Sequence, residues 1–64
     1  LHRWFRRTFE IRELTRALGI NPHDAPSQVA LGRAYFLNGE PQKAIPPLEA
    51  AFLLSFSLIQ SKSL

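Results

Sequence analysis

Hydrophobic residues recur at helical spacing in three segments of this 64-residue chain. Residues 2–18, 26–38 and 41–60 each place apolar side chains three or four positions apart, which is the spacing of one face of an α-helix. Glycine and proline separate the segments, and no segment alternates as a half-buried strand does. The pattern therefore predicts an all-α chain, with an amphipathic helix followed by an antiparallel helical hairpin.

The first segment is amphipathic and rich in arginine. Glu10 and Glu13 lie three or four positions from Arg6, Arg7 and Arg16 and can form ion pairs along the helix. The next turn signals predict where the helix ends: a glycine at 19 stops it, and a proline at 22 prevents it from continuing. The apolar positions of this segment are Leu1, Trp4, Phe5, Ile11, Leu14 and Leu18.

The second segment begins with Asp24, whose carboxylate is expected to accept the free N–H groups of the first turn. Pro26 falls in that first turn, where a missing N–H costs little. The segment is apolar on two opposite sides, and a helix of this kind needs a partner on each side. One side carries Leu31, Ala34 and Tyr35, and the other carries Val29, Arg33, Phe36 and Leu37.

The third segment follows a tight turn at Asn38 and Gly39, for which the glycine supplies a positive φ. Glu40 is expected to cap the helix, and Pro41 suits its first position. We expect one continuous apolar face facing the hairpin, and we expect Leu53 and Leu54 to point away from it. Leu53, Leu54 and Leu58 are left without obvious cover. The apolar face comprises Ala44, Ile45, Leu48, Ala51, Phe52, Phe56 and Ile59.

Two consecutive prolines conflict with this third helix. An interior proline costs about 3 kcal/mol and kinks a helix. Pro46 and Pro47 lie beyond the first turn, where proline is tolerated. The sequence therefore predicts an irregular stretch between Lys43 and Leu48.

The hairpin resembles a tetratricopeptide repeat (TPR), whose pattern is W-x2-L-G-x2-Y, then A-x3-F, then P, over about 34 residues. Gln28 stands in the tryptophan place, Leu48 in the aromatic place and Phe56 in the proline place. A second sign is an internal period, because Ala17 and Pro22 stand 34 positions before Ala51 and Phe56. Residues 1–64 would form a single TPR-like unit, with a complete motif at 25–58 and the preceding helix at 2–18. The matching packing residues are Leu31, Gly32, Tyr35, Ala44, Leu48 and Ala51.

The resemblance implies a protein–protein interaction module that binds a peptide or helix of a partner. Val29, Arg33, Phe36 and Leu37 match the places where TPR helices line their concave groove, and Arg33 suits an acidic group. The known TPR clamp for a C-terminal carboxylate is not supported, because Val29 and Ala30 occupy the places of its polar groups. The family pattern also places Gly32 at the close approach of the two helices, near Ala44 or Leu48.

Composition argues against catalysis, metal binding and a membrane span. The chain has no cysteine and only two histidines, and its longest uncharged stretch without proline is too short to cross a bilayer. His23, Asp24 and Ser27 are close in sequence, but the last two have a sufficient role at a helix start. We therefore expect no enzyme, no cofactor and no metal.

Two alternative functions remain. The open ends of the hairpin could serve self-assembly of a structural helical fragment. Less favoured is an anionic membrane or nucleic acid bound by the first helix, since residues 1–16 contain five arginines and two glutamates and account for the net charge of +3. Strong salt dependence of binding would single out this last function, and concentration-dependent helicity would favour self-assembly.

Overall fold

Three helices account for the secondary structure of this computed structural model, which describes residues 2–63 and the side chains of residues 7–60. They are α1 (His2–Ile20), α2 (Ala25–Leu37) and α3 (Pro41–Ser63). The described residues contain no strand. The predicted all-α fold is therefore confirmed. The expectations for Leu1, Arg3, Trp4, Phe5 and Arg6 lie outside the described side chains.

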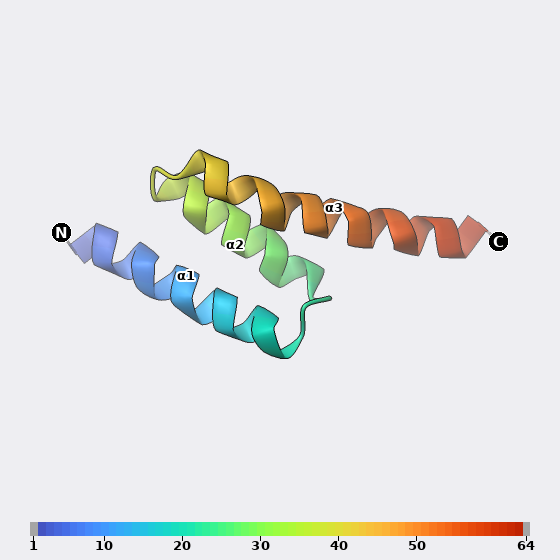
Figure 1. The fold of residues 1–64 in the computed structure, drawn as a ribbon, viewed down its shortest axis with the longest axis horizontal. Coiled ribbons are helices and arrows are strands. Elements are labelled where there is room, and N and C mark those ends of the chain that lie inside the picture. The colour runs from blue at the N-terminus through green and yellow to red at the C-terminus, as the bar shows by residue number, and fades with distance from the viewer. Residues whose placement is uncertain (1, 64) are drawn as a thin grey trace.

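The second helix lies between the other two and runs antiparallel to both (Figure 1). Within the described part, no Cα atom of α1 comes within 8 Å of one in α3. The third helix is the longest and extends well past the other two (Figure 1). The molecule measures 50 × 22 × 12 Å, and its radius of gyration is 13.1 Å. A compact chain of this length would have a radius of about 11 Å, so much of α3 lies outside the packed body.

Small side chains dominate the packed part of the molecule. Its buried hydrophobic residues include three alanines, and the described residues hold no large side chain that is fully buried. Small residues allow helix axes to approach closely, so the interfaces are tight but narrow. The buried hydrophobic residues are Leu18, Leu31, Ala34, Ala44 and Ala51.

The packing stripe of α3 differs from the expected one. Ala44, Pro47 and Ala51 are buried, and Leu54 continues this stripe in a half-buried position, contrary to the expectation that it points away. Four larger residues assigned to the packing face stand 41–67% exposed, and they are Ile45, Phe52, Phe56 and Ile59. The expected face was therefore wrong for these four residues, whereas Leu48, although 42% exposed, contacts Gly32 of α2 as expected. The reason is steric, because the close approach of α2 admits small or compact side chains and displaces large ones to its margin.

The end of α1 and the beginning of α2 also differ from expectation. Gly19 lies within the last turn of α1, which ends one residue later at Ile20, so this glycine does not stop the helix. Asp24 does occupy the N-cap position of α2, but its side chain makes no capping hydrogen bond to the backbone. The Ser27 hydroxyl donates to Asp24 Oδ2 over 2.7 Å instead. The carboxylate is thus satisfied by a side chain of the first turn.

The turn between α2 and α3 is built as predicted. Gly39 has φ +79°, the only positive value among the described residues. The Glu40 N–H donates to the Tyr35 carbonyl over 2.9 Å, and the Gly39 N–H donates to the Phe36 carbonyl over 3.1 Å. These two bonds form a Schellman motif, which satisfies carbonyls that the end of α2 would leave free.

The two prolines do not interrupt α3, contrary to the expected irregular stretch. Their missing N–H groups would have bonded to the carbonyls of Gln42 and Lys43, which lie in the exposed first turn. Water can satisfy these carbonyls there, so the loss of two bonds is moderated. Burial of Pro47 against α2 adds packing that favours the helical path.

Candidate functional site

The four residues predicted to bind a partner share one exposed side of α2, which we call the α2 outer face: Val29, Arg33, Phe36 and Leu37. The three apolar members are 49%, 63% and 46% exposed, in chain order. They lie at spacings of four, three and one residues and so follow one side of the helix. The structure brings these residues together on one surface, and their role in binding stays a prediction.

The opposite side of α2 is occupied within the chain. Leu31, Gly32 and Ala34 are buried there, between α1 and α3. The structure therefore shows apolar residues on both sides of this helix, as expected. One side is covered by neighbouring helices, and the α2 outer face is left to solvent.

The charge on the α2 outer face is not neutralised by any residue that the structure describes. Arg33 forms no ion pair with any residue the structure describes. The predicted pairing of α1 arginines with glutamates does occur at Arg7 with Glu10 and at Arg16 with Glu13, each with 3.9 Å between nitrogen and oxygen. Exposed pairs of this length contribute little to stability. Arg33 thus presents a cation beside three apolar side chains.

The close approach expected at Gly32 is present. A Cβ atom at this position would lie 2.5 Å from Leu48 Cγ and 3.2 Å from the Ala44 carbonyl oxygen. Only glycine fits this contact without displacing α3 or the Leu48 side chain. Leu48 is 42% exposed, but the branched end of its side chain covers Gly32.

The remaining residues matched to TPR packing also lie near this contact or along the same interface. Leu31, Ala44 and Ala51 are buried, and Tyr35 is half-buried. Their placement describes how the hairpin packs. It does not by itself identify a family.

Sequence reasoning missed a groove between α1 and α3, over the middle of α2. Two depressions of about 470 and 480 Å³ adjoin there, because Tyr35 and Lys43 line both. The first is lined also by Pro46, Pro47 and Ala50 of α3. The groove arises because α1 and α3 both pack on α2 while their own Cα atoms stay more than 8 Å apart in the described part. In the sequence, the only residue that hints at this groove is Tyr35, which the structure leaves half-buried.

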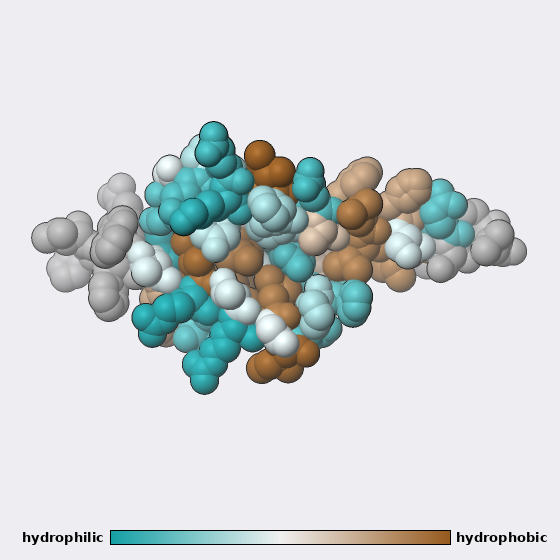
Figure 2. All heavy atoms as spheres, viewed as in Figure 1, coloured by the Kyte–Doolittle hydropathy of each residue, from teal (hydrophilic) through white to brown (hydrophobic). Residues whose placement is uncertain are grey.

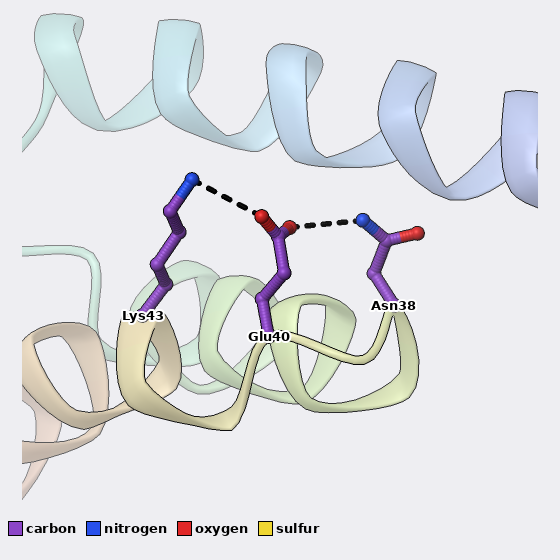
Figure 3. A network of polar contacts seen from close by, with 3 residues as sticks. All are labelled: Asn38, Glu40 and Lys43. Atoms are coloured by element: carbon purple, nitrogen blue, oxygen red, sulfur yellow. Dashed lines mark hydrogen bonds and ion pairs between the residues drawn. The ribbon is translucent and has the colours of Figure 1, made fainter.

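A polar network lies at one end of this groove, on the side of the α2–α3 turn that faces α1 (Figure 3). Asn38 Nδ2 donates to Glu40 Oε2 over 2.9 Å, and Lys43 Nζ lies 3.1 Å from Glu40 Oε1. The hydrogen bond from Asn38, followed by that from Lys43, lowers the pKa of Glu40 below its usual value. The hydrogen bond to Glu40 raises the pKa of Lys43. The carboxylate of Glu40, which was expected to cap α3, is therefore engaged by the side chains of Asn38 and Lys43.

The described residues show no grouping of side chains suited to metal binding. They contain no cluster of three or more His, Cys, Asp or Glu side chains. The Ser27 hydroxyl donates to Asp24, and the His23 N–H donates to Asn21 Oδ1 over 3.3 Å, so these residues serve the link between α1 and α2. Within the described part, every helix is too short or too polar to cross a bilayer.

Comparison with known proteins identifies no relative of this chain. No protein-family model matches the chain, and no curated protein and no solved structure is significantly similar to it.

Proposed function

We propose that this chain is a helical protein-interaction module that binds a peptide or helix of a partner protein through the α2 outer face. The observation that carries the proposal is the exposure of Val29, Phe36 and Leu37 beside Arg33, a cation with no ion pair among the described residues. Large apolar side chains gathered on one surface favour association with another apolar surface. An amphipathic segment can bury such a stripe.

The charge of this face limits the chemistry of the partner. A partner that covers Arg33 must supply a compensating anion, and a carboxylate can accept two parallel hydrogen bonds from the guanidinium. The preferred ligand is therefore an amphipathic segment with an acidic side chain one helical turn from its apolar residues. Charge pairing at Arg33 would fix the register, and Phe36 would supply most of the buried area.

We also propose that the hairpin is a TPR-type unit. Three features support this assignment: the antiparallel α2–α3 hairpin, the contact of Gly32 with Ala44 and Leu48, and the glycine turn at position 39. In a repeat array the α2 outer face would form part of a continuous concave surface.

Selection of binding peptides tests the proposed function directly. A library of random 15-residue peptides displayed on phage is selected against the folded chain, and the affinities of the enriched peptides are measured by fluorescence anisotropy. We expect enriched sequences to combine apolar residues with Asp or Glu. We expect Arg33→Glu and Phe36→Ala each to weaken their binding by about tenfold or more.

The chain offers matched controls for both substitutions. Arg12 is an exposed cation on α1 without an ion pair among the described residues, and Phe9 is 53% exposed on the same helix. Arg12→Glu and Phe9→Ala should leave the affinities unchanged. Absence of enriched peptides, or equal losses in the control variants, would contradict the proposed surface.

A further inference from the structure

The projecting part of α3 carries a depression that no helix of the chain fills. It has a volume of about 210 Å³ and is lined by Phe52, Ser55, Phe56, Ile59 and Gln60. The first four residues lie at positions i, i+3, i+4 and i+7, which is the diamond of four residues that accepts a side chain in knobs-into-holes packing. We call this depression the α3 hole.

The walls and floor of the α3 hole are suited to an apolar side chain. The rings of Phe52 and Phe56 meet edge to face, with centroids 6.2 Å apart and planes at 79°. This contact holds two large walls in place, while the small Ser55 leaves room between them. Hydrophobic residues gather over this projecting part of the helix in Figure 2.

The α3 hole belongs to a longer stripe with a period of seven. Ile45, Phe52 and Ile59 are spaced by seven residues, with Leu48 and Ser55 three positions after the first two. A seven-residue period is the pattern of helices that pair along their length. This stripe, which together with Phe56 we call the α3 seam, runs beside the residues that pack on α2 and shares only Leu48 with them, whose branch covers Gly32.

We infer that the α3 seam pairs with the α3 seam of a second copy of this chain, in antiparallel orientation. About a two-fold axis between Ser55 and Phe56, Phe52 of one copy faces Ile59 of the other, and Ser55 faces Phe56. Each copy thus offers both a hole and a knob of matching spacing. Such self-complementarity is what a two-fold interface between identical chains requires.

Charge favours a second copy as the occupant. The chain has no charged residue between Glu49 and Lys62, so two copies of this segment meet without like-charge repulsion and without burying a charge. The same segment has no charge to select the acidic or basic flanks of a different partner.

The area of the α3 seam is sufficient for a weak dimer. Ile45 lies outside the length that pairs about this axis, and the remaining large apolar residues, Leu48, Phe52, Phe56 and Ile59, are 41–67% exposed. Their exposed parts amount to roughly 430 Å² per copy, taking roughly 200 Å² for a fully exposed large apolar residue. Two copies would bury roughly 850 Å², which is below the roughly 1,200 Å² of a stable interface and is typical of a weak, transient one.

The shape of the molecule sets the orientation. Only the N-terminal part of α3 is flanked by α2, and α3 extends past both other helices (Figure 1). Antiparallel pairing places the two packed bodies at opposite ends of the dimer. Parallel pairing would bring the two bodies side by side at the same end.

Sedimentation analysis tests the pairing with two variants of similar exposure. The unmodified chain should shift from monomer to dimer between about 10 μM and about 1 mM, the range expected for an interface of this size. Phe52→Ser should weaken dimerisation by at least about tenfold. Leu53→Ser should leave dimerisation unchanged, because Leu53 lies off the α3 seam. The two variants are comparable, since Phe52 is 67% and Leu53 is 64% exposed.

Cysteine cross-linking tests the orientation, since the chain has no cysteine of its own. At an axis separation of about 9 Å, residues beside the two-fold axis, such as the two copies of Ser55, have Cα atoms about 4–7 Å apart, within reach of a disulfide. Ser55→Cys should therefore form a covalent dimer on mild oxidation. Ile45→Cys should not, because it faces itself only in a parallel pair.

Several results would overturn the inference. A chain that stays monomeric at about 1 mM removes the interface. Equal losses in Phe52→Ser and Leu53→Ser would show non-specific apolar association. Efficient cross-linking of Ile45→Cys would replace the antiparallel arrangement with a parallel one. Circular dichroism of each variant confirms that the helices are intact before these results are compared.

Discussion

The two halves of α3 use hydrophobic residues in opposite ways. Residues 41–51 pack on α2 through the small or compact Ala44, Pro47 and Ala51. Residues 52–60 carry larger apolar side chains, and most of these are exposed, Phe52 and Leu53 among them. Burial along this helix is therefore set by how closely the neighbouring backbone approaches, and only secondarily by the hydrophobicity of each residue. The exposed half presents most of its large side chains to solvent.

The largest expected effect comes from placing a charge in the packed half. Ala51 is 5% exposed, and Ala51→Asp would bury a carboxylate without a partner. An uncompensated buried charge costs about 3–5 kcal/mol, which is comparable to the whole stability of a chain of this size. We expect loss of cooperative thermal unfolding, followed by circular dichroism at 222 nm.

The control for this change lies in the other half. Ser57 is exposed on α3, away from the α3 seam, and Ser57→Asp should leave the thermal midpoint nearly unchanged. If both variants unfold alike, the distinction between a packed and a projecting half is wrong.

A smaller effect is expected at the glycine that sets the close approach. Gly32→Leu would force Leu48 and the Ala44 backbone aside, and overpacking of this kind costs about 1–3 kcal/mol. Chemical denaturation of the variant and the unmodified chain measures this cost. The same substitution made together with Leu48→Ala should cost less than the two separate changes combined, because the clash with Leu48 is removed. An unchanged denaturation midpoint in Gly32→Leu would contradict both the tight interface and the TPR assignment.

The smallest effect concerns the polar network that begins the packed half. The pKa of Glu40 is lowered by its hydrogen bonds, so its contribution to stability is present above the usual glutamate value of 4.5 and is lost as pH falls through the lowered pKa. The pKa of Lys43 is raised, so its contribution is present below 10.5 and is lost as pH rises through the raised pKa.

The check is a series of thermal midpoints measured from acid to alkaline pH. Glu40→Gln should flatten the acid side of the profile, and it should also remove the rise in the pKa of Lys43. Glu49→Gln is the control, since Glu49 has no ion pair among the described residues. A profile that Glu40→Gln leaves unaltered would show that the network does not contribute.

The sequence predicted those features that depend on local chemistry. The number of helices, the positive φ at Gly39 and the close contact at Gly32 follow from periodicity and from the properties of glycine. The sequence also grouped the four residues of the α2 outer face on one side of the helix, and the structure places them there, exposed.

Features that depend on tertiary geometry were not accessible from the sequence. Periodicity alone assigned Phe52 and Phe56 to the packing face, whereas the tight interface selects Ala51 and Pro47. Local rules likewise predicted a disturbance at the two prolines, where packing on α2 overrides the loss of two hydrogen bonds. The groove over Tyr35 requires the relative placement of three helices, which no single segment encodes.

The separation of the α1 and α3 backbones, which have no Cα atoms within 8 Å of each other in the described part, has a consequence for local unfolding. The main interface of each outer helix is with α2, so the helices resemble a linear chain of nearest neighbours. Either outer helix can detach while the other interface persists, whereas unfolding of α2 disrupts both. Amide hydrogen exchange should therefore be slowest in α2 and should reveal separate opening free energies for α1 and for the free end of α3.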